Sequence, residues 1–316
     1  MKLKIDNKIV DISKCKGYRA ADFNPDQIFD CGQCFRWEKN AEGIWETPER
    51  LGLTAGGDST YDLNGEEPHV SGDIDTYSDI DIAGTELHNK TCSTYDANDT
   101  LRKYFDLDRD YGAIKEYLAE GDPIMAKAIE VGSGIRILNQ PKWETLISFI
   151  ISQNNNIPRI KGCINSLART LGKDGQLPKP EVLADASTDD IACCKLGYRD
   201  KYLIETARQV LRMPKLLDQL AESDVSASEA VEVLQKLSGV GPKVANCIAL
   251  FGLGKVDCFP LDVWMKRVMN QLYGIPEGDV KAMKKFAEEH FAPYGGIAQQ
   301  YLFYFITHKG VDNDPK

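Results

Sequence analysis

Residues 237–250 read LSGVGPKVANCIAL and place two glycines, Gly239 and Gly241, directly before Pro242. Glycine allows backbone conformations that side chains forbid, and proline suits the first position of a helix. Apolar residues recur at helical spacing on both sides, at Ala230, Val233, Leu234 and Leu237 and at Val244, Cys247, Ile248 and Phe251. Ser226 and Glu229 form an S-x-x-E capping box ahead of the first set. The stretch therefore predicts a helix, a tight glycine hairpin and a second helix.

Such a hairpin has two interpretations. Its amides and the N-terminus of the second helix form a neutral anion site that suits a DNA phosphate and needs no basic patch. The alternative is an ordinary corner between two helices, and the two glycines alone do not decide between them.

The composition excludes several classes of protein. The chain has 316 residues, 42% hydrophobic and 27% charged, which is enough for about two globular domains and excludes a disordered or fibrous protein. It contains no run of 18 apolar residues that could span a membrane. The start, MKLKIDNKIVDIS, lacks the apolar core of a signal peptide, and the nine cysteines include only one CxxC, at Cys31 and Cys34. We expect a reduced cytoplasmic protein, nucleoid-associated if prokaryotic, that is not secreted.

The net charge of −10 is local. Residues 46–100 hold 13 Asp and Glu against 2 Lys and Arg, and the rest of the chain is nearly neutral. The repeated Asp-Ile of DIDTYSDIDI (73–82) lacks the glycine and terminal glutamate of a calcium loop, so we expect a solvated acidic loop there. The whole segment is compatible with strand hairpins joined by long loops or with a partly disordered insertion. An acidic block does not exclude DNA, because binding depends on local surfaces.

The chain divides into two patterns. Residues 1–45, including CFRW at 34–37, are strand-like, whereas helical periodicity dominates from about 101 onward. We expect an α+β protein: an N-terminal domain at 1–118 with an antiparallel sheet and the acidic insertion, then an all-helical domain at 119–316.

Six blocks of sequence, in order, resemble the eukaryotic type of 8-oxoguanine DNA glycosylase/AP lyase, a branch of the helix–hairpin–helix DNA glycosylases. They are GQCFRW (32–37), SFIISQNNNIPRI (148–160), LGYRDKYL (196–203), LSGVGPKVANCIAL (237–250), PLDVW (260–264) and GGIAQQYLF (295–303). Residues 46–100 have no clear counterpart. The resemblance implies a base excision repair enzyme that removes 8-oxoguanine from double-stranded DNA, preferably opposite cytosine, and acts as a monomer.

The resemblance implies the catalytic pair. Lys243 would attack C1′ of the damaged nucleotide, form a Schiff base and permit β-elimination of the 3′ phosphate. A solvated lysine amine is protonated at neutral pH, so the site must desolvate Lys243 or hold it near other cations. Asp262 would stabilise the positive sugar, as carboxylates do in glycoside hydrolysis, and it can also cap a helix.

The resemblance also implies the binding residues. The flipped base would lie between Phe303 and Cys247, with Gln299 on its Watson–Crick edge and the Gly32 carbonyl on N7–H. The expected DNA contacts are Asn154 in the gap left by the base, Tyr198 as a wedge, Arg159 and Arg199 on the unpaired cytosine, and Gly239 and Gly241 on phosphate. The carbonyls of Gln235, Leu237 and Val240 could hold a monovalent cation.

Three residues depart from the family. Trp264 stands where the eukaryotic enzymes have histidine, Asn246 replaces an aspartate and Phe251 a methionine. We expect no cofactor, because no cysteine follows Cys258 to build the iron–sulfur loop of other members. The alternatives are a glycosylase of this fold with another damaged-base substrate, a non-catalytic helix–hairpin–helix DNA-binding protein, or a protein-interaction or salt-adapted role for the acidic block.

Overall fold

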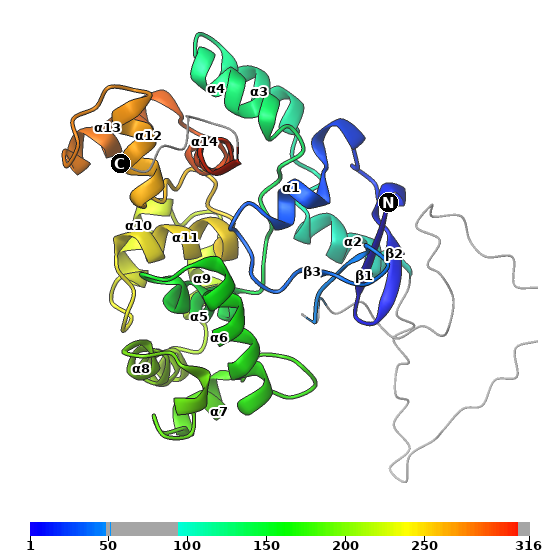
Figure 1. The fold of residues 1–316 in the computed structure, drawn as a ribbon, viewed down its shortest axis with the longest axis vertical. Helices are drawn as coiled ribbons and strands as arrows, with labels where there is room; N and C mark the ends of the chain where they lie inside the picture. Colours follow the sequence, from blue (N-terminus) through cyan, green and yellow to red (C-terminus); the bar gives the residue numbers. More distant parts are fainter. Residues whose placement is uncertain (49–50, 52–93, 309–316) are drawn as a thin grey trace, which may run out of the picture.

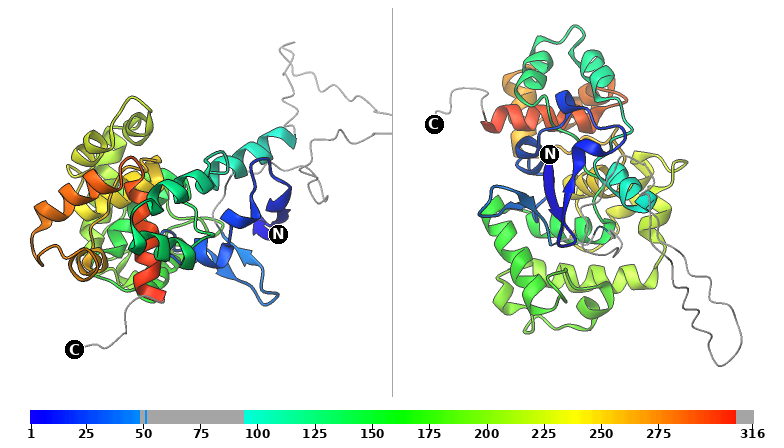
Figure 2. Two further views of the ribbon diagram at one scale, coloured as in Figure 1. Left: turned by 90° about the horizontal axis from the view of Figure 1, so that it is seen from above. Right: turned by 90° about the vertical axis from the view of Figure 1, so that its right-hand side faces the viewer.

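The computed structural model describes residues 1–48, 51 and 94–308 (Figure 1). Most of the acidic segment 46–100, including residues 73–82, lies outside the described residues. The N-terminal strands lie on one side of the molecule and the later helices on the other, as Figure 1 and the left view of Figure 2 show. Among the described residues, no helix is long and apolar enough to cross a membrane.

A small four-stranded sheet forms the N-terminal part. Its strands β1 (Lys2–Ile5), β2 (Lys8–Asp11), β3 (Glu38–Lys39) and β4 (Trp45–Glu46) lie in the order β2-β1-β4-β3. Asp6 and Asn7 both have positive φ, 50° and 61°, which suits the two-residue turn between β1 and β2. The outer pairs are antiparallel, as expected, and the central β1–β4 pair is parallel.

The expectation that residues 1–45 are strands is wrong in part. The CFRW segment, 34–37, is buried coil, and short helices occupy Ile12–Lys14, Ala20–Asp22 and α1 (Pro25–Phe29). A half-buried strand alternates inward and outward side chains, but all four side chains here are buried. Cys34 and Trp37 pack in the N-terminal core and Phe35 in the helical core, so the segment links the two.

The remainder of the described chain is helical, as the periodicity predicts. The helices are α2 (Thr94–Tyr104), α3 (Tyr111–Ala119), α4 (Pro123–Val131), α5 (Lys142–Ser152), α6 (Ile157–Thr170), α7 (Pro180–Asp185), α8 (Arg199–Arg212), α9 (Leu216–Ala221), α10 (Ala227–Leu234), α11 (Pro242–Leu253), α12 (Val263–Gln271), α13 (Val280–His290) and α14 (Gly295–His308), with a 3₁₀ turn at Ala192–Cys194. The predicted apolar run is α5, buried from Thr145 to Ser152.

Two hydrophobic cores meet at residues 31–37, whose buried side chains are divided between them. The N-terminal core contains Trp37 stacked on Phe29, with ring centroids 4.0 Å apart. The helical core takes in Cys31 as well as α3 and α4. Arg136, fully buried, donates to the carbonyls of Phe105 at 3.0 Å and Arg109 at 3.1 Å. The predicted division at 118/119 stays a prediction.

The helix–hairpin–helix is confirmed. Ser226 and Glu229 make both hydrogen bonds of the capping box, and Pro242 begins α11 with Gly241 as its N-cap. The first helix ends at Leu234, so Leu237 lies in the hairpin and not on the helix face. Gly239 has φ +73°, and a Cβ there would lie 2.7 Å from Tyr202. The hairpin thus needs glycine at 239, and it places Lys243 at the second position of α11.

Candidate active site

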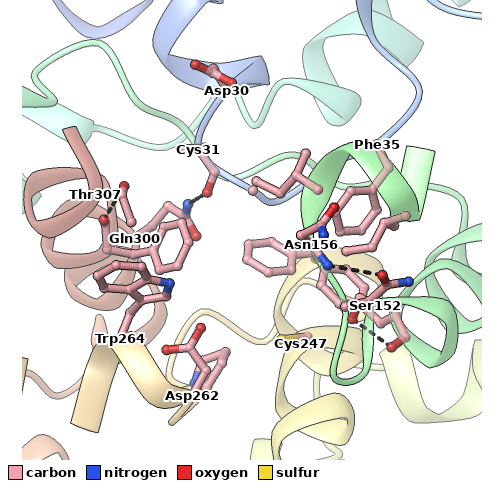
Figure 3. Close-up of a pocket in the computed structure, with 18 of the residues that line it drawn as sticks. Asp30, Cys31, Phe35, Ser152, Asn156, Cys247, Asp262, Trp264, Gln300 and Thr307 are labelled. Carbon is pink, nitrogen blue, oxygen red and sulfur yellow. Dashed lines mark hydrogen bonds between the residues drawn. The ribbon is translucent and has the colours of Figure 1, made fainter. Parts of the chain in front are cut away.

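A cavity of about 540 Å³ brings together the six residues expected to hold and cleave the damaged nucleotide. They come from four separate parts of the chain: Lys243, Cys247, Asp262, Gln299, Phe303 and Gly32. In Figure 3, Asp262 and Cys247 lie on one side of the cavity, and Cys31 and Phe35 lie on the other. The N-terminal segment and the helical core therefore build one site.

Lys243 has an aromatic neighbour. Its Nζ lies 5.4 Å from the centroid of the Phe149 ring, and its side chain is partly buried. His308 is the other basic side chain among the described residues that line the cavity, so no Lys or Arg lies beside the amine there. The Phe149 ring therefore covers one side of the Lys243 amine where it faces the cavity.

Asp262 is an N-cap and a cavity residue at once. Its Oδ1 accepts the Met265 amide at 2.8 Å at the start of α12. Burial raises the pKa of its carboxyl above the ordinary 3.8, while the Met265 amide and the charge of Lys243 oppose that rise. The cap fixes the carboxylate, and the cavity gives it access to a bound nucleotide.

Gly32 lies against Phe303. Its φ is +76°, and a Cβ built on it would lie 3.2 Å from Cε1 of Phe303. The next residue, Gln33, is fully buried and anchors the loop with both ends of its amide. Its Nε2 donates to the carbonyls of Ile28 at 2.9 Å and Arg136 at 2.8 Å, and its Oε1 accepts the Leu138 amide at 2.9 Å.

Gln299 and Cys247 offer an acceptor and a thiol to the cavity. Gln299 is 5% exposed, and its Oε1 has no hydrogen-bond partner among the described residues. A buried acceptor left unpaired is destabilising, so such an atom suits a ligand. Burial raises the pKa of the Cys247 thiol above its usual value, against the charge of Lys243, so the thiol is neutral at pH 7. The neighbouring Gln300 donates to the Cys31 carbonyl and holds α14 to the N-terminal segment.

The four side chains expected to contact DNA lie outside the cavity lining. Asn154 is exposed in the turn between α5 and α6, with φ +44°, and Arg159 is exposed on the first turn of α6. Tyr198 is 51% exposed, and the guanidinium of Arg199 stacks on it at 4.5 Å.

Arg199 is already hydrogen bonded. It is 4% exposed and donates to three carbonyls: Gln153 and Leu196, each at 2.9 Å, and Asn154 at 3.0 Å. These bonds engage four of the five guanidinium N–H groups, so Arg199 has little hydrogen-bonding capacity left for an unpaired cytosine while it holds these carbonyls.

The hairpin residues differ in their surroundings. A Cβ on Gly241 would meet open space, in contrast to Gly239. Of the three carbonyls expected at a cation, that of Leu237 accepts the Val240 amide at 3.1 Å and keeps one lone pair. The donor set of Gln235, Leu237 and Val240 is compatible with a monovalent cation, which stays a prediction.

Two of the three family departures reach the cavity. Trp264 lines it, with Arg267 stacked on the indole at 4.8 Å, and Phe251 lines it too, stacked on Phe149 at 5.4 Å. Asn246 instead donates back to the Pro242 carbonyl at 2.8 Å and is not among the cavity-lining residues.

Sequence reasoning missed Phe149 and Phe35 as cavity residues. Both stand inside quoted family blocks, but an apolar residue in a buried run is indistinguishable from ordinary core without the fold.

Comparisons with known proteins agree with this geometry. Residues 17–146 match the family described as 8-oxoguanine DNA glycosylase, N-terminal domain, and residues 147–293 match the HhH-GPD superfamily base excision DNA repair proteins. The N-glycosylase/DNA lyase of Saccharomyces cerevisiae is 37% identical over 210 residues, 58% of this chain and 54% of that protein. A probable N-glycosylase/DNA lyase of Methanothermobacter thermautotrophicus is 29% identical over 218 residues, 60% of this chain and 69% of that protein.

Solved structures extend the match to most of the chain. A structure of MBOgg1 with a low-affinity DNA ligand is 37% identical with a TM-score of 0.71, covering 91% of this chain and 93% of that one. The Clostridium acetobutylicum 8-oxoguanine glycosylase/lyase, bound to DNA with cytosine opposite 8-oxoguanine, is 33% identical with a TM-score of 0.71, covering 91% and 92%. The alignment to the yeast enzyme spans about half of that protein's length. The chain belongs to the 8-oxoguanine DNA glycosylase/lyase family of helix–hairpin–helix base excision repair enzymes.

Proposed function

We propose that this protein excises 8-oxoguanine from double-stranded DNA and then cleaves the strand, acting as a monomer. The observation that carries the proposal is that one cavity brings together an amine, a carboxylate and a glutamine oxygen with no hydrogen-bond partner among the described residues. A base must leave the helical stack before such residues can reach it. A cavity of about 540 Å³ that opens beside the hairpin suits a flipped nucleotide.

Excision begins with the Lys243 lone pair. The amine attacks C1′, the C1′–N9 bond breaks, and the base leaves with the bonding electrons and takes up a proton. The Asp262 carboxylate lies close enough for charge to couple with Lys243, so it stabilises positive charge developing on the sugar. The amine, now joined to C1′, loses one proton, and its lone pair then forms the C1′=N bond of an iminium as the C1′–O4′ bond breaks and O4′ takes up a proton. Loss of a C2′ proton then expels the 3′ phosphate by β-elimination.

Recognition of the base uses one polar group on each edge. The Gly32 carbonyl accepts N7–H, which 8-oxoguanine has and guanine lacks, and Gln299 pairs with the Watson–Crick edge. Phe303 covers one face of the ring, and the neutral thiol of Cys247 covers the other. The Oε1 of Gln299, which accepts no hydrogen bond from the described part of the chain, gains a partner from the base.

We propose a preference for cytosine opposite the lesion, read by Arg159 and, after it leaves its carbonyls, by Arg199. Cytosine offers two acceptors, O2 and N3, whereas adenine places an amino donor beside N1. Each lost contact of this kind weakens discrimination by about 1–3 kcal/mol, or roughly ten- to a hundredfold. The exposure of Arg159 beside the Asn154 turn supports this role.

Borohydride trapping on a duplex with 8-oxoguanine tests the chemistry. We expect wild type to form a covalent adduct, and Lys243→Gln to lose both adduct and excision while it still binds DNA. Lys285→Gln, which removes a side chain 72% exposed on α13, is the matched control and keeps both activities. An adduct in Lys243→Gln would assign the nucleophile to another amine. Activity on an alkylated base alone would assign a different substrate, and binding without excision would leave a DNA-binding protein.

Single-turnover rates test the opposite-base proposal. We expect faster excision opposite cytosine than opposite adenine, with a ratio that falls about tenfold or more in Arg159→Ala. Equal rates in wild type, or an unchanged ratio in Arg159→Ala and Arg199→Ala, would refute it.

We propose that the chemical steps use no redox cofactor and no metal ion. A monovalent cation at the hairpin carbonyls of Gln235, Leu237 and Val240 would contribute to DNA binding only. Replacing sodium and potassium by a bulky organic cation at constant ionic strength would then weaken binding without changing the rate of the bound complex.

A further inference from the structure

Gln153 joins two DNA-facing parts of the site. It is the C-cap of α5 and directly precedes Asn154. Its Nε2 donates to the Ile150 carbonyl at 3.0 Å and to the Gly239 carbonyl at 2.8 Å. The side chain therefore ties the turn that carries Asn154 to the glycine hairpin, 86 residues further along the chain.

Helix α8 braces the same two parts from another direction. Its first residue, Arg199, holds the carbonyls of Gln153 and Asn154. Two turns later, Thr206 donates to the Ser238 carbonyl at 2.6 Å, and Gln209 accepts the Ser238 amide at 2.7 Å. The turn and the hairpin are thus held both directly, through Gln153, and indirectly, through α8.

We propose that Gln153 is a positioning residue that fixes the Asn154 turn relative to the hairpin, so that phosphate binding at the hairpin sets the depth at which Asn154 enters the DNA. The inference deepens the proposed function and rests on it. Gln153 touches neither the cavity nor the reacting atoms, and it acts through Asn154.

The geometry of the duplex makes this link useful. A phosphate bound by the hairpin and the gap left by a flipped base are separated by a fixed distance, so Asn154 must be held at a matching distance from the hairpin. Asn154 is exposed and has φ +44°, a conformation that asparagine tolerates but that few side chains favour. If Arg199 leaves its carbonyls to read cytosine, the Gln153–Gly239 hydrogen bond still connects the turn to the hairpin.

The test is Gln153→Met, which keeps the length of the side chain and removes its donor. A duplex with 8-oxoguanine and 2-aminopurine as its neighbour reports unstacking by fluorescence, and single-turnover assays report excision. We expect unstacking and excision to fall about three- to tenfold, the range that one neutral hydrogen bond supplies. Affinity for undamaged DNA and the melting temperature should stay near wild type. Gln153→Glu, which also lacks the donor, gives a second measurement if the methionine variant folds poorly.

Gln209→Met is the matched control, because Gln209 braces the hairpin without touching the Asn154 turn. We expect this variant to weaken binding to damaged DNA and to undamaged DNA equally. In an Asn154→Ala background, Gln153→Met should have no further effect on unstacking, because the two act as one unit.

Three results would overturn the inference: wild-type unstacking in both Gln153 variants, equal losses on damaged and undamaged DNA, or additive effects with Asn154→Ala. Wild-type protein that neither unstacks nor excises 8-oxoguanine would instead refute the proposed function, and the inference with it. Normal wild-type activity with an unaffected Gln153→Met refutes the inference alone.

Discussion

Replacing Gly32 by alanine should separate backbone strain from damage to the base-binding cavity. Gly32 has φ +76°, and the left-handed region is unfavourable for alanine by about 1–2 kcal/mol. The new Cβ would also lie 3.2 Å from Cε1 of Phe303, so the ring must move by a few tenths of an ångström. Because a displacement of about 1 Å can lower a rate roughly a hundredfold, we expect this smaller one to slow excision about tenfold.

Gly43→Ala is the matched control. Gly43 has φ +75°, and a Cβ there would meet no atom within 4 Å. Both variants should lose about 1–2 kcal/mol of stability in thermal unfolding, but only Gly32→Ala should lose excision in single-turnover assays on 8-oxoguanine opposite cytosine. Equal excision rates in the two variants would refute the argument that the Gly32–Phe303 contact shapes the base site.

Three further predictions follow from the geometry. Asp262→Asn should keep the N-cap and lower excision about a hundredfold or more. Because burial raises the pKa of Asp262, excision by the wild type should fall as the pH drops through a value above 3.8. The variant should be no less stable at pH 7, because Asp262 is ionised there and burial disfavours that charge in the folded protein. Alkylation of the native protein should label Cys193 before Cys31. Cys193 is exposed and the Thr170 hydroxyl lowers its pKa, whereas Cys31 is buried and burial raises its pKa to about 12. Peptide mass spectrometry over a time course measures the order, and faster labelling of Cys31 would contradict the prediction. Asp122→Ala removes the N-cap of α4 and leaves Tyr273 and His290 without their acceptor, so denaturant unfolding should show that the protein loses about 2–4 kcal/mol of stability. The control Asp279→Ala removes only the N-cap of α13 and should lose about 1 kcal/mol. Similar losses in the two variants would contradict the role of the Tyr273 and His290 bonds.

Local chemistry explains which elements could be predicted. The capping box at Ser226 and Glu229, the helix start at Pro242 and the apolar run of α5 are signals within a few residues, and all are confirmed. The prediction of a strand at CFRW was wrong because β-prone residues are typical of buried positions as well as of paired strands. Its four side chains are buried in two different cores, which a sequence pattern cannot reveal.

In the candidate site too, the residues within sequence motifs could be predicted, whereas contacts between distant parts of the chain could not. The family resemblance identified Lys243, Asp262, Gly32, Cys247, Gln299 and Phe303, and the fold places all six around one cavity. It could not reveal that Arg199 donates to three carbonyls, because those partners depend on how the turn between α5 and α6 packs against α8. The Gln153–Gly239 hydrogen bond is hidden for the same reason.

The geometry also explains how a chain with net charge −10 suits an anionic partner. The described cavity lining contains Lys243 and His308 with Asp30 and Asp262, so it carries no strong positive field of its own. Backbone amides at the hairpin and the N-terminus of α11 supply local positive potential instead, without adding to the net charge. Under the proposed function, a site built from amides, a capped carboxylate and one lysine beside an aromatic ring recognises a flipped nucleotide by position more than by charge. That dependence on position is why the contacts that hold the Gly32 loop and the Asn154 turn matter as much as the residues that touch the base.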